Sequence, residues 1–176
     1  MVQEKTLVLI KPEAVKKGYI GQIILRIESR GFRFDNMRLL NATKEQCLLH
    51  YNKDDVWCER QGQRKIDQGL TECESALEVG RQILDQMSVY FMSGPLLAMI
   101  VEGENCIERI HELVGATEPI SAKPGTLRGD LSHDSYHIAN QQNRAIYNVA
   151  HSSENEHDAL REIDIWFPGY WDKNQA

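Results

Sequence analysis

Apolar residues along this chain recur with two periods, one typical of strands and one typical of helices. Residues 96–101 (Leu-Leu-Ala-Met-Ile-Val) form an uninterrupted apolar run, which predicts a buried strand. Residues 104–114 have apolar side chains at helical spacing, and Gly115 follows as a stop signal. Read in this way, the whole chain predicts strands at 5–10, 32–40, 96–101 and 145–151, and helices at 20–27, 43–51, 76–91, 104–114 and from 153 onward.

Helix boundaries are marked by local signals as well as by periodicity. Thr43-Lys44-Glu45-Gln46 has the spacing of a capping box, which predicts a short helix running towards Tyr51. Ser153-Glu154-Asn155-Glu156 has the same S-x-x-E spacing and predicts that the last helix begins at Ser153. In that helix Leu160, Ile163, Trp166 and Phe167 form one apolar stripe.

Two segments lack a clear period. Residues 52–75 are polar, mixed in charge and contain two glycines, so we expect a surface excursion there. Residues 116–144 are rich in Gly, Pro, Ser and Asn, which predicts a long loop.

The order of the elements favours one fold class. A β-α-β-β-α-β core with added helices accounts for it economically, which means an α+β, ferredoxin-like sandwich with an antiparallel sheet. We expect a single domain over residues 1–176, a length that buries a sizeable core. A doubly wound parallel sheet is less favoured. The first strand is followed by Lys11-Pro12-Glu13, which matches neither G-x-G-x-x-G nor a Walker A loop.

The most informative candidate for chemistry is His151. It lies at the end of the predicted strand 145–151 and directly before a helix start, where free N–H groups and the helix dipole favour a phosphate. A neutral imidazole there is a suitable nucleophile for phosphorus. Glu162 lies about three turns into the following helix and is placed to orient the ring. The alternative is that His151 is an ordinary surface or core histidine.

Composition and charge narrow the partners. The net charge of −6 argues against general binding to nucleic acid. No apolar run is long enough to span a bilayer, and the N-terminus lacks the pattern of a secretory signal, so we expect a cytoplasmic protein without membrane attachment. The four cysteines form no C-x-x-C pair, and free thiols are the expected state.

Five short motifs carry a family likeness. In chain order they resemble those of nucleoside diphosphate kinases, and the likeness runs from about residue 5 to residue 168. The motifs are Leu9–Glu13 (LIKPE), Ser93–Pro95 (SGP), Val114–Thr117 (VGAT), Lys123–Asp130 (KPGTLRGD) and Asn148–His151 (NVAH).

This resemblance implies an activity and a set of partners. Members of the family move the γ-phosphoryl of a nucleoside triphosphate, such as ATP, onto a histidine and then onto a nucleoside diphosphate. Mg²⁺ arrives with the nucleotide and is held mainly by its phosphates and water. The family forms homo-oligomers. Segments 52–78 and 131–143 look longer than in short members and resemble a longer bacterial-type variant, so the excursion noted above is expected to be an inserted, structured arm.

The resemblance also implies a role for particular residues. By the resemblance, His151 is the phosphorylated histidine, Glu162 orients its ring, Lys11 is the third catalytic residue, and Ser153 neighbours the histidine. The positions implied to bind phosphate, ribose or the wall of the site are Lys11, Tyr51, Thr117, Arg128 and Asn148. Their chemistry suits this, because lysine is a compact cation and arginine grips two phosphate oxygens at once.

One position departs from the family pattern. Four residues before Gly115 the family usually has a phosphate-binding arginine, and this chain has His111. Arg109 lies two residues away, nearly on the opposite side of the helix, and is a poor substitute. We therefore expect reduced activity, and a nucleotide-binding or assembly module with little turnover is the alternative function. Trp57 is a candidate to stack on the base, although the insertion leaves that alignment loose.

Overall fold

The computed structural model describes residues 3–173, and its centre is one antiparallel sheet. The strands lie in the order β2-β3-β1-β4, and each neighbouring pair is antiparallel. This is the strand order of a ferredoxin-like core, so the predicted fold class is confirmed and a parallel doubly wound sheet is excluded. The strands are β1 (Gln3–Ile10), β2 (Arg33–Asn41), β3 (Pro95–Glu104) and β4 (Ala150–Ser152).

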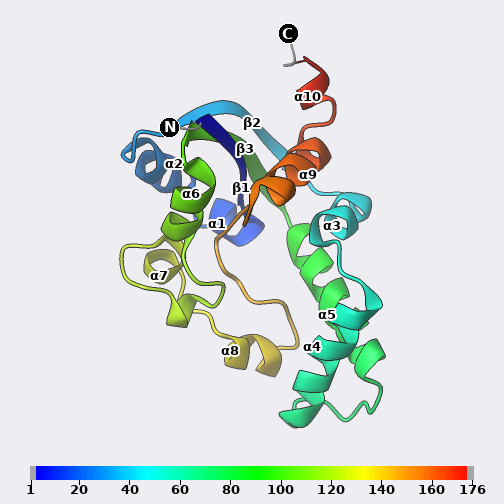
Figure 1. Ribbon diagram of the computed structural model, residues 1–176. Helices are drawn as coiled ribbons and strands as arrows, with labels where there is room; N and C mark the ends of the chain where they lie inside the picture. Colours follow the sequence, from blue (N-terminus) through cyan, green and yellow to red (C-terminus); the bar gives the residue numbers. More distant parts are fainter. Residues whose placement is uncertain (1–2, 174–176) are drawn as a thin grey trace.

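Helices cover both faces of the sheet (Figure 1). On one face, α2 and α6 pack on the apolar side chains of β1 and β3. On the other face, α3, α5 and α9 bury a second cluster that contains Phe91 and Trp166. The helices are α1 (Pro12–Lys16), α2 (Ile20–Glu28), α3 (Lys44–Tyr51), α4 (Asp55–Asp67), α5 (Ala76–Phe91), α6 (Cys106–Val114), the 3-10 helix η1 (Pro119–Ser121), α7 (Leu127–Leu131), α8 (Tyr136–Gln141), α9 (Glu156–Trp166) and α10 (Tyr170–Lys173).

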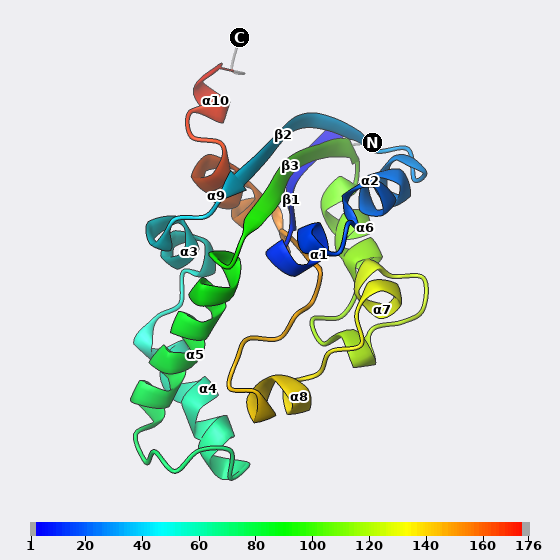
Figure 2. The same cartoon turned by 180° about the vertical axis from the view of Figure 1, so that it is seen from behind.

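Helices α4 and α5 form an arm that projects from the sheet, with α7 and α8 on the opposite side (Figures 1 and 2). The two helices pack so closely that a Cβ atom on Gly80 would lie 1.9 Å from the carbonyl oxygen of Cys58. A Cβ atom on Gly62 would lie 1.8 Å from the carbonyl oxygen of Ala76. Only glycine permits this contact between backbones. The polar excursion expected at 52–75 is therefore mostly helical and tightly packed.

Several sequence-based expectations are confirmed. The capping box at Thr43 is present, because its side chain accepts from the N–H of Gln46 and the Gln46 side chain accepts in return. Helices α2 and α5 begin at the predicted residues, and the four cysteines are free thiols.

The segment predicted as a loop over 116–144 is wrong in part, because it contains η1, α7 and α8. Thr126 and Ser135 cap the two α-helices through their hydroxyl groups. Both helices are short, at five and six residues, so they carry too few turns to show a helical period.

The end of the chain differs in three details. The strand predicted at 145–151 is only three residues long, Ala150–Ser152. The cap predicted at Ser153 is wrong, because Asn155 caps α9 by accepting from the N–H of Asp158. Leu160, placed on the apolar stripe, is 48% exposed. Ser153 is instead fully buried, and its hydroxyl donates to the Glu162 carboxylate and does not cap the helix.

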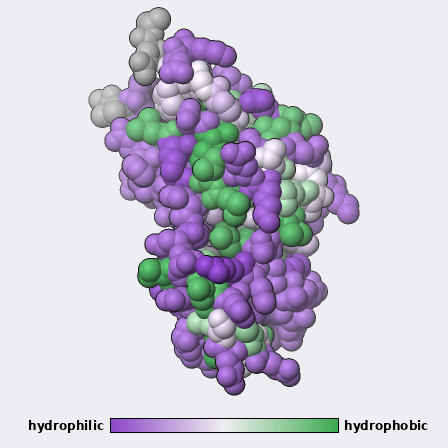
Figure 3. Space-filling model, turned by 90° about the vertical axis from the view of Figure 1, so that its right-hand side faces the viewer, coloured by the Kyte–Doolittle hydropathy of each residue, from purple (hydrophilic) through white to green (hydrophobic). Residues whose placement is uncertain are grey.

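The face of the molecule on the side of the arm is largely hydrophilic. Figure 3 looks onto the arm side and shows apolar surface as separate patches among polar groups. Over residues 3–173, no helix is long and apolar enough to cross a membrane.

Candidate active site

A cleft of about 670 Å³ opens between the arm on one side and α8 with the segment before β4 on the other. Its volume is in the range of small-molecule sites. Side chains from distant parts of the sequence meet in it, and they include seven that the sequence singled out. These are Lys11, Tyr51, Thr117, Arg128, Asn148, His151 and Glu162.

His151 lies in β4, where it pairs with Leu9 of β1, so the sheet fixes its backbone. Its Nε2 atom lies 2.8 Å from Oε2 of Glu162. The same carboxylate oxygen accepts a 2.7 Å hydrogen bond from the hydroxyl of Ser153. Because an ionised carboxylate only accepts, Nε2 carries the proton and the lone pair of the neutral ring lies on Nδ1.

The surroundings of His151 favour the neutral ring. Burial lowers its pKa well below the usual value, and the nearby cations Lys11 and Arg128 lower it further. The side chain is still 22% exposed, on the side of the cleft. Burial also raises the pKa of Glu162, against the opposing effects of His50 and Ser153. The geometry therefore presents an unprotonated, oriented imidazole to the cleft.

Lys11 lies between the last residue of β1 and the first residue of α1, as the N-cap residue of α1, and its side chain lines the cleft. It is 8% exposed, and its Nζ atom donates to Oδ1 of Asn148 at 2.5 Å. The ammonium lies 5.3 Å from the ring centre of Tyr90 and 5.2 Å from that of Phe91. Burial, with the charge of Arg128, lowers the pKa of Lys11 to about 7. A cation held this way, with little water around it, interacts strongly with an anion.

Arg128 lies in α7 and is 6% exposed. Its guanidinium donates to three backbone carbonyls, those of Gly115 at 2.8 Å, Ala150 at 2.9 Å and Asn148 at 3.3 Å. Burial lowers its pKa to about 10, which keeps it charged at neutral pH. Arginine has five N–H groups. In the part of the chain described, one N–H of each terminal nitrogen has no protein acceptor and is available to an anion in the cleft.

The three neutral groups complete the walls. Asn148 is 3% exposed, and its Nδ2 atom donates to the carbonyl of Thr117 at 2.9 Å. This bond ties the loop after α6 to the segment before β4. Tyr51 packs edge-on against Phe91, with ring centres 5.2 Å apart, and burial raises its pKa well above the usual value. Its hydroxyl therefore stays protonated and remains a donor.

Sequence reasoning missed one member of this cluster, His50. The ring is 3% exposed and stands edge-on to His151, with centres 4.4 Å apart. Its Nδ1 atom accepts from the indole of Trp166 at 3.3 Å and lies 3.7 Å from Oε1 of Glu162. Its position beside Tyr51 at the end of α3 was a weak signal. Only tertiary packing reveals that it supports the Glu162–His151 pair.

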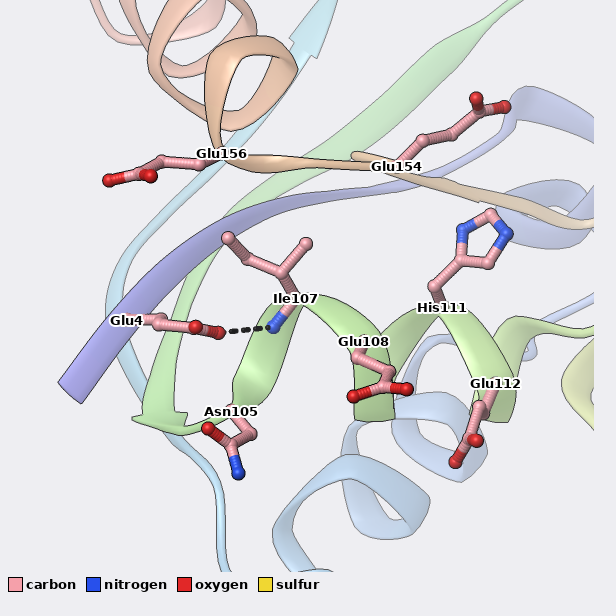
Figure 4. Close-up of a pocket in the computed structure, with 8 residues that line it drawn as sticks. All are labelled: Glu4, Asn105, Ile107, Glu108, His111, Glu112, Glu154 and Glu156. Atoms are coloured by element: carbon pink, nitrogen blue, oxygen red, sulfur yellow. Dashed lines mark hydrogen bonds between the residues drawn. The ribbon is translucent and has the colours of Figure 1, made fainter. Parts of the chain in front are cut away.

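His111 lies at the rim of the cleft, and its Nδ1 atom is 3.3 Å from the hydroxyl of Ser152. It also borders a second hollow of about 370 Å³. Figure 4 shows this hollow and the hydrogen bond from the Ile107 N–H to Glu4. Five carboxylates line it and repel phosphate, so the cleft at His151 is the candidate active site. The acidic side chains are Glu4, Glu108, Glu112, Glu154 and Glu156.

The donor atoms in the cleft do not fit a magnesium ion held by protein alone. Within residues 3–173, the group of side chains that comes close enough to share a metal is His50, His151 and Glu162. Mg²⁺ prefers six oxygen ligands, whereas two of these three donors are imidazole nitrogens.

Comparison with known proteins agrees with the fold. In the cleft, two buried basic side chains, Lys11 and Arg128, lie around the oriented ring of His151. The profile of the nucleoside diphosphate kinase family matches residues 4–56 and 72–170. The chain belongs to this family. The match omits 57–71, which holds most of α4.

Two relatives are similar over nearly their full length. A nucleoside diphosphate kinase of Pyrobaculum aerophilum is 35% identical, over 95% of this chain and 96% of that protein. A nucleoside diphosphate kinase of Borreliella burgdorferi is 34% identical, over 95% of this chain and 89% of that protein. Among solved structures, an NDP kinase from Pyrobaculum aerophilum has a TM-score of 0.86 at 33% identity, covering 94% of this chain and 96% of that one. The structure of a nucleoside-diphosphate kinase from Borrelia burgdorferi, in a transition-state mimic with bound vanadate and ADP, has a TM-score of 0.77 at 34% identity. It covers 95% of this chain and 88% of that one.

Proposed function

We propose that this protein is a nucleoside diphosphate kinase that works by a ping-pong mechanism through phosphohistidine at His151. The observation that carries the proposal is the His151–Glu162 pair: Nε2 of His151 lies 2.8 Å from Oε2 of Glu162, and the ring lines a cleft that also contains the buried cations Lys11 and Arg128. Membership of the family supports it.

In the proposed first step, the Nδ1 lone pair forms a bond to the γ-phosphorus of a nucleoside triphosphate. The bond from that phosphorus to the bridging oxygen breaks, and the nucleoside diphosphate leaves with the electron pair. A second nucleoside diphosphate then attacks the phosphohistidine through a terminal oxygen, and Nδ1 regains its lone pair. No net proton transfer is needed, so positioning and charge stabilisation are the main tasks of the protein.

The remaining groups receive roles that suit their chemistry. Lys11 and Arg128 neutralise the charge that develops on the transferred group and on the leaving oxygen. Asn148 and Thr117 are neutral hydrogen-bonding groups suited to phosphate and ribose. Tyr51 closes the wall next to the histidine. The Borrelia burgdorferi relative with vanadate and ADP gives a precedent for nucleotide and phosphoryl-like groups in this fold.

The other inferences from the resemblance stay proposals. The nucleotide phosphates, with water, would hold Mg²⁺, which would supply partial neutralisation of their charge. The protein is cytoplasmic, forms a homo-oligomer, and has neither a nucleic-acid nor a membrane partner. An exposed edge strand supports the oligomer, since β2 presents Met37 and Leu39, which are 41% and 61% exposed. We also propose a single domain over 1–176, with insertions near 52–78 and 131–143.

The test is incubation with ATP labelled in the γ-phosphate. We expect acid-labile label on the protein that transfers to GDP or CDP, and no label on the His151→Ala variant. A stable label or transfer without a protein-bound intermediate would overturn the mechanism.

A second candidate function is a nucleotide-binding or assembly module of the same fold with little turnover. The observation that favours it is His111, where the family usually has a cation. Binding of ADP without formation of phosphohistidine would support this candidate over the kinase.

A further inference from the structure

The backbone immediately before His151 makes an unusual turn at Val149. Its φ angle is +67°, a left-handed conformation that is an outlier for a β-branched residue. The N–H of Ala150 donates to the carbonyl of Asn148 at 2.7 Å, so residues 148–150 close a three-residue γ-turn. Such turns are strained and persist only where the surroundings hold them.

This turn separates two groups of the site. Asn148 lies before it and accepts from Lys11, and His151 lies after it and pairs with Glu162. Their side chains meet in one cleft because the chain reverses sharply at Val149. An extended residue at 149 would send one of the two away from the phosphate position, because successive side chains of a strand point to opposite faces.

Three contacts hold the turn in place. The N–H of Lys11 donates to the carbonyl of Val149 at 2.9 Å, and Arg128 donates to the carbonyls on either side of it. The third contact is from Glu13, whose Oε1 atom accepts the N–H of Val149 at 2.7 Å. Val149 is 1% exposed, so without this carboxylate its N–H would be buried and unpaired.

The location of Glu13 needs an explanation beyond phosphate binding. It follows Lys11 by two residues, and its charge acts on that lysine. A carboxylate beside the cations of an anion site weakens their attraction for phosphate. Its other oxygen, Oε2, is buried without a hydrogen-bond partner at normal distance among the described residues, and the carboxylate also helps to raise the pKa of the buried Tyr90 hydroxyl. The bond from the Val149 N–H is the short hydrogen bond that this carboxylate accepts, and it is the contact that bears on the turn.

We propose that Glu13 is a positioning residue, which holds Val149 in the left-handed turn so that the side chains of Asn148 and His151 both face the same phosphate position in the cleft. This inference rests on the proposed kinase function for its kinetic consequences, but the contact itself is testable without activity.

The kinetic test combines Glu13→Ala, Glu13→Gln and Val149→Gly. Glu13→Ala lowers kcat on the order of 10- to 100-fold, because the turn relaxes and His151 is displaced. Glu13→Gln keeps an oxygen that accepts the N–H, so its kcat stays within about threefold of the wild type. Glycine adopts a positive φ without strain, so on the Val149→Gly background the further loss from Glu13→Ala falls below about threefold.

The second readout is hydrogen–deuterium exchange at the Val149 amide, which does not depend on turnover. We expect slow exchange in the wild type and in Glu13→Gln, and exchange at least about tenfold faster in Glu13→Ala. The exposed Glu28, at the end of α2, provides the control substitution Glu28→Ala, which leaves both readouts unchanged.

Each result decides between this role and another. Equal loss in Glu13→Ala and Glu13→Gln would assign the effect to charge and overturn the proposal, as would additive effects of Glu13→Ala and Val149→Gly. An unchanged exchange rate of the Val149 amide in Glu13→Ala would also overturn the proposal. This result decides the matter even where a variant is too unstable for kinetic measurements. If the wild type forms no phosphohistidine, the proposed function fails while the exchange data still test Glu13.

Discussion

The Oε2 atom of Glu162 lies 2.8 Å from Nε2 of His151 and accepts from the Ser153 hydroxyl at 2.7 Å. One carboxylate oxygen thus fixes both the tautomer and the direction of the imidazole. This relationship links α9 to β4 and makes the chemistry at Nδ1 depend on a residue eleven positions further along the chain.

Replacement of that carboxylate should impair the transfer step. We expect Glu162→Ala to lower kcat about 10- to 100-fold, since the ring loses its preferred tautomer and orientation. Steady-state kinetics with ATP and GDP measure this, with KM for ATP changing less than about threefold. Ser153→Ala is the matched control, because it removes one hydrogen bond to the same oxygen and is expected to cost less. A larger effect from Ser153→Ala would contradict this account.

The pH profile should report the charge of Lys11. Burial and Arg128 lower the pKa of this lysine to about 7, so its charged form is lost as pH rises through that value. We expect kcat/KM to decline on the alkaline side of about pH 7, because kcat/KM follows the free enzyme. In Lys11→Arg the decline moves to higher pH, since a guanidinium keeps its proton. An unchanged alkaline limb in Lys11→Arg would assign the decline to another group.

A cation at position 111 should improve the enzyme. His111 borders the cleft and hydrogen-bonds with Ser152, at the position where the family usually has arginine. We expect His111→Arg to raise kcat/KM for ATP by about one decade, the effect of one added charge-assisted bond to phosphate. Arg109 is absent from the walls of the cleft, so Arg109→Gln is the control and is expected to change little. No gain in His111→Arg would show that position 111 does not reach the nucleotide.

Trp57 should contribute to binding of the base. Its indole lines the cleft from α4, with the ammonium of Lys53 5.7 Å from the ring centre. We expect Trp57→Ala to raise KM for ATP about tenfold with little change in kcat, because stacking on an aromatic ring is worth about 1–3 kcal/mol per base. Val56→Ala, at a neighbouring residue that is 69% exposed, should leave KM unchanged. A loss of kcat without a rise in KM would point to a role other than stacking.

The arm should depend on its glycine contact. Gly80→Ala places a methyl group within 1.9 Å of the Cys58 carbonyl, so α4 and α5 must separate. We expect a loss of about 1–3 kcal/mol in the free energy of unfolding, measured by chemical denaturation. Gly21→Ala is the matched control, since a Cβ there meets nothing within 4 Å and alanine is the better helix former. Equal stability of the two variants would contradict the close packing.

The parts of the fold that sequence reasoning predicted have strong local signals. The apolar run of β3 and the periodicity of α5 need no tertiary information, and both are confirmed. Most of the site residues were predicted because short motifs carry them, whereas Tyr51 and Glu162 were predicted from the wider family resemblance, and the structure brings them all into one cleft. The ferredoxin-like order followed from the sequence of strands and helices alone.

What was missed depends on contacts between distant residues. The strand before His151 is short because Val149 takes a positive φ, which no pattern of valine, alanine and asparagine indicates. Ser153 had the spacing of a cap, but its hydroxyl donates to Glu162 in the middle of α9, and Asn155 caps that helix instead. His50 became part of the site through Trp166, more than a hundred residues away.

The five carboxylates beside His111 make the electrostatic field around the cleft uneven for an anionic ligand. A polyphosphate near that hollow is repelled by charges of its own sign. On the opposite side of the cleft, Lys53, Arg64 and Lys65 provide positive charge. For an acidic protein this local asymmetry matters more than the overall charge, because it favours the approach of a nucleotide from the side of the arm.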